Sequence, residues 1–174
     1  FLQETGGTLA SLAASTLEQL DACLPRTWSH GNPIDIIGDA PGSRYEDAVR
    51  IALEDPGIDA LLTINCPTAV ADNVEAAQAV ISATGQGSKP VLTCWLGDGA
   101  AADARHVLND AGFPTFETEG QAVHAFSYLV RHRRNQLLLQ EVPPVRVASK
   151  GVVEQVRPVI TQALEEGRTW LSEV

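Results

Sequence analysis

The chain has 174 residues and carries 12 basic against 22 acidic side chains, a formal net charge of −10. This charge disfavours nucleic acid and anionic lipid as partners, because both would repel it. No apolar run reaches the roughly 18 residues that a membrane span needs, so we expect a cytoplasmic protein with no nucleic-acid and no membrane partner.

Helices and strands are predicted to alternate along the chain. Capping boxes, in which Ser or Asp is followed three residues later by Glu, begin at Ser15, Ser43 and Asp72 and predict three helix starts. Hydrophobic periodicity and the positions of Gly and Pro supply the other boundaries. In chain order we expect a helix over 15–24, a strand over 33–37, a helix over 43–54, a strand over 58–65, a helix over 72–84, a strand over 89–95, a helix ending at Gly112, a strand over 114–116 and a helix over 120–140.

This alternation predicts an α/β fold with a short parallel sheet. The run Ile58–Asn65 is almost continuously apolar, as in strands that are covered on both faces. Short loops between alternating strands and helices imply right-handed crossovers. We expect a flavodoxin-like domain over residues 33–142, with helices on both faces and strand order 2-1-3-4, in which strand 1 is the segment 33–37.

The chain changes character after Pro143 and Pro144. We expect residues 143–174 to be a linker, with Pro158 in the first turn of a helix that ends at Gly167. The sequence contains no Met, even at position 1, so we expect a piece of a longer protein.

Candidate binding residues follow the predicted strands. Ligands of open parallel sheets bind beyond the carboxyl ends of the strands, where helix N-termini present N–H groups to anions. The loop from Cys66 to Asp72 is the strongest candidate for an anion site, while ordinary helix caps are the alternative, since every such fold has these loops. The candidate anion-binding residues are Pro67, Thr68, Ala69 and Val70, and the secondary loop candidates are Asp35, Gly38, Asp39, Gly97, Asp98 and Gly99.

Several features have both a functional and a structural interpretation. Asp35 and Asp39 could form a carboxylate pair or shape a turn. Cys66 could be a nucleophile or inert, and the three cysteines, odd in number and without metal-site spacing, are expected to be free thiols. Asp103, His106 and Asp110 could be metal ligands or a solvated helix face. For His30, a role in turn formation is favoured over a catalytic role. Arg131–Arg134 could be a docking surface or a solvated face. We expect no metal site. The residues by themselves indicate an α/β module, with anion binding as one hypothesis.

The motif order resembles that of NDP-forming acyl-CoA synthetases, the superfamily of succinyl-CoA synthetase. His30–Ala40 (HGNPIDIIGDA) resembles the signature NPxDxxGDA. The similar segments that follow are Asp55–Leu62, Cys66–Ala69, Lys89–Val91, Ala111–Phe116, Arg133–Gln136 and Glu166–Leu171.

The resemblance implies a multidomain enzyme that interconverts acyl-CoA, ADP and phosphate with acid, ATP and CoA, with Mg²⁺. A phosphohistidine in the preceding domain would be held between two helix N-termini, of which the loop Cys66–Val70 supplies one. Residues 1–32 would be the tail of that domain, which follows a CoA-binding domain, and residues 143–174 would lead to an ATP-grasp domain. No histidine here matches the phosphohistidine motif, so we expect no catalytic residue, no bound cofactor and no activity in this chain alone.

We weighed two other functions, of which one stays open. The Cys66–Ala69 loop is also common in bacterial fusions with protein acetyltransferases, in which this domain would be a non-catalytic regulatory or assembly module. A response-regulator domain is disfavoured, because the required acidic cluster with a following Thr and Lys is missing. Formation of a homo-oligomer by this protein also stays open.

Overall fold

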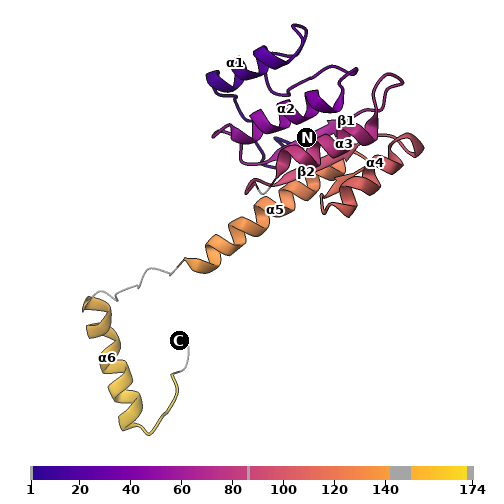
Figure 1. The fold of residues 1–174 in the computed structure, drawn as a ribbon. Helices are drawn as coiled ribbons and strands as arrows, with labels where there is room; N and C mark the ends of the chain where they lie inside the picture. Colours follow the sequence, from indigo (N-terminus) through magenta and orange to yellow (C-terminus); the bar gives the residue numbers. More distant parts are fainter. Residues whose placement is uncertain (1, 86, 142–149, 172–174) are drawn as a thin grey trace. The chain divides into compact units, whose positions relative to one another are not determined.

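The computed structural model describes residues 2–85, 87–141 and 150–171. The chain divides into two compact units, Phe1–Arg134 and Asn135–Val174. The helices and strands (Figure 1) are α1 (Ala14–Cys23), α2 (Gly42–Glu54), β1 (Leu61–Asn65), α3 (Asn73–Thr84), β2 (Val91–Trp95), α4 (Gly99–Asp110), β3 (Thr115–Phe116), α5 (Glu119–Gln140) and α6 (Lys150–Glu165).

The first unit contains a three-stranded parallel sheet in the order β1-β2-β3. Leu61 pairs with Val91 at the start of β1, and Asn65 pairs with Trp95 at its end. β3 joins the other side of β2. The predicted α/β fold with a short parallel sheet is confirmed. All three carboxyl ends point the same way, so the loops that follow β1, β2 and β3 lie at one end of the sheet.

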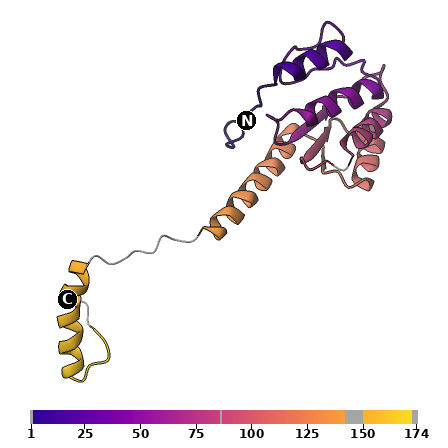
Figure 2. The same cartoon turned by 60° about the vertical axis from the view of Figure 1, so that its left-hand side comes forward.

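Helices cover both faces of the sheet, as predicted. Val91 and Trp95 belong to a core with buried residues of α2, α3 and α4. Leu92 and Cys94 point to the opposite face and are also buried. Figure 2 shows the strands between α4 and the start of α5, where Ala122 is fully buried.

A second cluster joins α1 to α2. Leu20, Leu24 and Trp28 pack against Ala48 and Ile51 of α2, so α1 is part of the first unit. The buried carboxylate of Asp55 strengthens this attachment, because it accepts hydrogen bonds from the N–H groups of Ala13 (2.9 Å) and Gly57 (2.7 Å). These bonds hold the pKa of Asp55 below its ordinary value.

The predicted strand over 33–37 is wrong, and so is its place between the next two strands, since β1 pairs directly with β2. Side chains bind the main-chain groups that a ladder would use. Ser29 Oγ donates to Pro33 O (2.6 Å) and accepts from Asp35 N (2.9 Å). The Asp35 carboxylate accepts from Ile37 N (2.9 Å), and Ile37 has φ of +68°. Such local bonds compete with strand pairing.

Two of the three predicted caps are also wrong. α1 begins after Ala13 and α2 after Pro41, and neither Ser15 nor Ser43 is the N-cap. Residues distant in sequence take over this role at α2, where the Glu75 carboxylate accepts from Gly42 N (3.1 Å). Tertiary partners therefore replace the local ones that the capping boxes predict.

The C-terminal helix begins earlier than predicted. α6 starts at Lys150, so Pro158 lies in its interior and not in its first turn. A valine stripe at helical spacing extends the helix on the N-terminal side of Pro158, although this proline has no N–H for the carbonyl of Glu154. The predicted boundary between residues 142 and 143 lies outside the described residues. Among the described residues, no helix combines the length and apolar character of a membrane span.

Candidate functional site

Three of the predicted loops meet at the carboxyl end of the sheet. Thr68 Oγ1, in the loop after β1, donates a hydrogen bond to Gly38 O (2.9 Å). The loop after β2 approaches from the other side, since a Cβ atom built on Gly97 would lie 3.9 Å from Pro67 Cγ. Main-chain segments far apart in sequence therefore surround Pro67 and Thr68. The structure brings the primary candidates together with Gly38 and Gly97.

Asp72 caps the N-terminus of α3, as the capping box predicts. Its carboxylate accepts hydrogen bonds from the N–H groups of Val74 (2.8 Å) and Glu75 (3.1 Å). These two N–H groups are therefore occupied. The Glu75 side chain departs from the capping box, because it binds Gly42 of α2 and not Asp72.

The N–H groups free to bind an anion lie just before the cap. Within the described ranges, no hydrogen bond is donated by the N–H groups of Thr68, Ala69 or Val70. Thr68, Ala69 and Val70 are exposed, and Val70 is 74% accessible. Successive free N–H groups before a helix are suited to phosphate oxygens.

An open depression of about 520 Å³ adjoins these N–H groups. It is lined by Ala69, Val70, Ala71, Asp72, Asn73, Val74, Ala100 and Asp103. Two N–H donors partly offset the negative charge of the Asp72 carboxylate. The charge of Asp103 repels an anion at the α4 end of the depression. An anion is therefore favoured at the loop side, near Thr68 and Ala69.

Arg105 of α4 organises the loop after β2, and the sequence analysis missed it. Its guanidinium donates to the carbonyl oxygens of Trp95 (2.9 Å) and Asp98 (3.1 Å), and also to Gly97 O. The side chain is only 13% exposed and lies 3.8 Å from a carboxylate oxygen of Glu117. Asp98 is the N-cap residue of α4, yet its side chain makes no capping bond. No local pattern marks an arginine that binds carbonyls seven to ten residues earlier.

Asp35 and Asp39 have structural roles in the third of these loops, the segment 35–41 that precedes α2. Asp39 pairs with the Arg44 guanidinium at 2.7 Å, and that hydrogen bond and charge hold the pKa of the Asp39 carboxyl below its ordinary value. Arg44 also donates to Ile36 O at 3.0 Å. Asp35 binds the N–H of Ile37. The turn interpretation of both carboxylates agrees with this geometry, and their pairing with each other is replaced by these partners.

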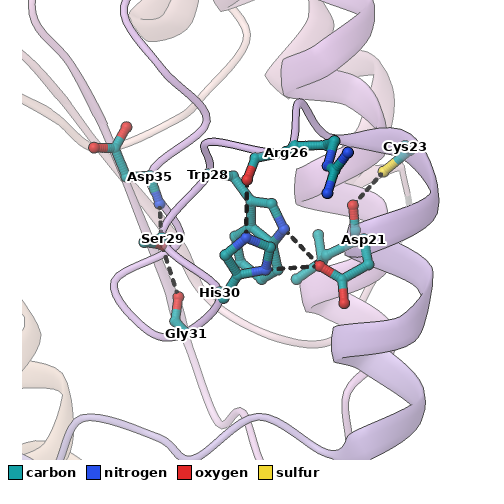
Figure 3. Close-up of polar contacts among 9 residues, drawn as sticks. Asp21, Cys23, Arg26, Trp28, Ser29, His30, Gly31 and Asp35 are labelled. Carbon is teal, nitrogen blue, oxygen red and sulfur yellow. Dashed lines mark hydrogen bonds and ion pairs between the residues drawn. The ribbon is translucent and has the colours of Figure 1, made fainter.

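His30 lies in a separate cluster that joins the 25–35 loop to α1 (Figure 3). Its Nδ1 is 2.8 Å from the Asp21 carboxylate, and its Nε2 is 3.1 Å from Arg26 O. The Trp28 indole donates to the same Asp21 oxygen (2.8 Å), and its ring centroid is 4.9 Å from that of His30. Both ring nitrogens thus have protein partners, consistent with turn formation.

The other sequence candidates do not join the three loops. The described residues contain no group of three His, Cys, Asp or Glu side chains that could hold a metal ion, which leaves Asp103, His106 and Asp110 as a helix face. Cys66 is exposed and Cys94 is buried, and both are free thiols, as is Cys23. Arg131–Arg134 are exposed on α5.

The comparisons with known proteins agree on one family. The family model for the Ligase-CoA domain matches residues 2–139. The chain is 33% identical over 162 residues to the ADP-forming acetate–CoA ligase I of Archaeoglobus fulgidus, which covers 93% of this chain and 22% of that protein. It is 31% identical over 138 residues to the alpha subunit of the ADP-forming acetate–CoA ligase II of Pyrococcus furiosus, covering 77% of this chain and 30% of that subunit.

Solved structures show the same similarity. The protein PH0766 of Pyrococcus horikoshii matches with a TM-score of 0.74 and 32% identity, covering 77% of this chain and 32% of that chain. The structure of the dinucleotide-forming acetyl-coenzyme A synthetase 1 of Ca. Korarchaeum cryptofilum, in complex with phosphate and ADP, matches 81% of this chain with a TM-score of 0.72 at 29% identity. This chain covers 32% of that one. It therefore spans between about a fifth and a third of the length of these relatives.

Proposed function

The chain belongs to the Ligase-CoA domain family, and we propose that it serves a longer NDP-forming acyl-CoA synthetase by presenting a helix N-terminus to a phosphohistidine. The phosphorylated histidine belongs to a preceding domain. CoA, the adenine nucleotide and Mg²⁺ bind elsewhere in the enzyme. Residues 1–32 connect to the histidine domain, residues 143–174 lead to an ATP-grasp domain, and the chain is inactive by itself.

The observation that carries this proposal is the row of free N–H groups at residues 68–70, where three loops meet. A phosphoryl group on histidine carries about two negative charges and has three acceptor oxygens. The N–H groups before α3 and the positive end of its dipole favour that charge at short range. The contact from Thr68 to Gly38 holds the loop in place before the phosphohistidine arrives, which lowers the cost of ordering it.

The test is phosphorylation of the histidine in the intact enzyme, measured by transfer from labelled ATP. Ala69→Asp adds a carboxylate beside the free N–H groups and is expected to reduce phosphorylation at least tenfold. Gln78→Glu adds the same charge at an exposed position farther along α3 and serves as the control. Equal phosphorylation in the two variants would contradict the proposal.

A second pair of variants separates main chain from side chain. Thr68→Pro removes one of the free N–H groups and is expected to slow phosphorylation. Thr68→Val removes only the hydroxyl and keeps that N–H group, so it should have the smaller effect. The reverse order would show that the Thr68 hydroxyl, and not the main chain, matters.

One observation weakens phosphoryl binding and so keeps a second function open, that of a non-catalytic module in an acyl-CoA-dependent protein acetyltransferase. Asp72 occupies two α3 N–H groups, and Asp103 places a further negative charge in the same depression. Both reduce the attraction for a phosphoryl group. If the intact protein transfers acetyl groups to protein lysines at the same rate with Ala69→Asp, and takes up no label on histidine, this second function replaces the first.

A further inference from the structure

A cavity of about 170 Å³ separates β1 from the segment that precedes α2. One wall is the segment 33–36, the second is β1, and the third is a row of mostly small apolar residues on α2. The lining residues are Asn32, Pro33, Ile34, Ile36, Tyr45, Ala48, Val49, Ala52, Leu61, Leu62, Thr63 and Ile64. Close-packed interiors rarely leave such a space between an extended segment and a strand.

The side of β1 that faces this cavity is the free edge of the sheet. Leu61 N donates to Pro90 O, and Asn65 O accepts from Leu96 N, so residues 61, 63 and 65 direct their main-chain groups toward β2. The main-chain groups of Leu62 and Ile64 then point to the opposite edge. No other described segment forms a backbone hydrogen bond with them, and the Ile64 side chain is 47% exposed.

A buried hydroxyl without a partner lies on the same strand. Thr63, Thr93 and Thr115 occupy one row across β1, β2 and β3. Thr93 Oγ1 and Thr115 Oγ1 are hydrogen-bonded at 2.8 Å. Thr63 is only 8% exposed, lines the cavity, and its Oγ1 has no hydrogen-bond partner among the described residues. A buried hydroxyl left unpaired is costly, so the row lacks a member on its β1 side.

We propose that the free edge of β1 pairs with a fourth strand, whose side chains enter this cavity and which comes from a part of the longer protein outside residues 1–174, an inference that rests on the proposed function in a longer enzyme. Free N–H and C=O groups on an edge strand are the basis of strand addition. The longer protein has enough further chain to supply this strand, since more than two thirds of each matched structure lies outside the region that this chain covers. The edge of β1 is independent of the phosphohistidine site.

The walls of the cavity specify the strand. Ala48, Val49 and Ala52 leave room for β-branched or larger apolar side chains on the α2 face. The residue opposite Thr63 is expected to be Ser or Thr, because it completes the threonine row. Five residues would match the length of β1, which spans Leu61–Asn65.

Amide hydrogen exchange in the intact protein and in the 174-residue chain tests the proposal. The N–H groups of Leu62 and Ile64 are expected to exchange at least tenfold more slowly in the intact protein. Those of Thr63 and Asn65 point to β2 and serve as internal controls that are protected in both. Equal exchange of Leu62 and Ile64 in the two proteins would overturn the proposal. Protection in the 174-residue chain that grows with its concentration would also overturn it, and would assign the edge to a second copy.

A variant pair gives a second test. Ile64→Pro removes the outward N–H, which an edge strand tolerates and a paired strand does not, whereas Ile64→Thr keeps it. In the intact protein, Ile64→Pro is expected to have the lower urea midpoint of the two. In the 174-residue chain the two midpoints should differ much less. The same difference in both proteins would count against the fourth strand.

Discussion

The helices α3 and α4 begin in equivalent places, each after a neighbouring parallel strand and each with aspartate as its N-cap residue, yet their N-termini are held differently. Asp72 binds two N–H groups of α3 through its carboxylate. Asp98 makes no such bond, and Arg105 instead holds its carbonyl oxygen. The two residues have nearly the same φ, −87° and −88°, but ψ of 116° and −102°. The same residue type therefore caps a helix only where the backbone points its carboxylate at the N–H groups.

The largest expected effect comes from removing the arginine on the α4 side. Arg105→Ala leaves the carbonyl oxygens of Trp95, Gly97 and Asp98 without their donor. Since hydrogen bonds to a charged group contribute roughly 1.5–3 kcal/mol each, and not additively, we expect a loss of about 3 kcal/mol in the free energy of unfolding. Urea unfolding measures it. Arg105→Lys keeps the charge but not the fork of donors and should recover only part of the loss; full recovery would mean that charge alone holds the loop.

The next largest loss of stability is expected where α2 contacts the first turn of α3. A Cβ atom on Gly42 would lie 2.8 Å from Glu75 Cγ and 3.1 Å from Glu75 O. Gly42→Ala should therefore displace the first turn of α3 and cost about 1–2 kcal/mol, as overpacking does. Gly99→Ala is the matched control on α4, because nothing lies within 4 Å of a Cβ atom there. Similar midpoints for the two variants in urea would contradict the contact.

Removal of each aspartate in turn tests whether only the Asp72 carboxylate caps its helix. Asp72→Ala takes away a cap and is expected to cost about 1 kcal/mol. Asp98→Ala takes away no capping bond and should change the stability by less than about 0.5 kcal/mol. Equal losses in thermal or urea unfolding would show that the Asp98 carboxylate acts on α4 after all.

The smallest expected effect concerns pH and the third loop. The Arg44 guanidinium lowers the pKa of the Asp39 carboxyl, so the stabilisation from this pair is complete above the unfolded pKa of Asp39. It is lost as the pH falls through the lower folded pKa. Because Asp39 is exposed, this contribution is small. In an NMR titration, Arg44→Gln should return the pKa of Asp39 toward its ordinary value, and an unmoved titration would exclude the ion pair as the cause.

Local patterns in the sequence predicted those parts of the fold whose partners are close in sequence. The run over 58–65 identified β1, and the pattern over 89–95 identified β2. Asp72 caps α3 because its partners, Val74 and Glu75, lie two and three residues away. The parallel sheet with helices on both faces follows from short crossovers, which admit few alternatives.

Patterns failed where a partner distant in sequence took over. Ser43 is not a cap, because Glu75 serves the start of α2 from another helix. The segment 33–37 is apolar like a strand, but bonds from Ser29, Asp35 and Arg44 use its main-chain groups. A pattern search sees the apolar alternation and not these bonds.

The sequence by itself therefore determined the type of every element that the structure contains, the parallel arrangement and the family, but it also predicted a strand over 33–37 that does not form. The correct predictions rest on short-range periodicity and on motif order. Only the tertiary structure decided what each loop binds. It brought Thr68 to Gly38 and Pro67 to Gly97. It assigned Arg105 to the loop after β2 and left the edge of β1 open beside a cavity. Hydrogen bonds and packing across tens of residues depend on how the elements are arranged in space, and no local pattern encodes that arrangement.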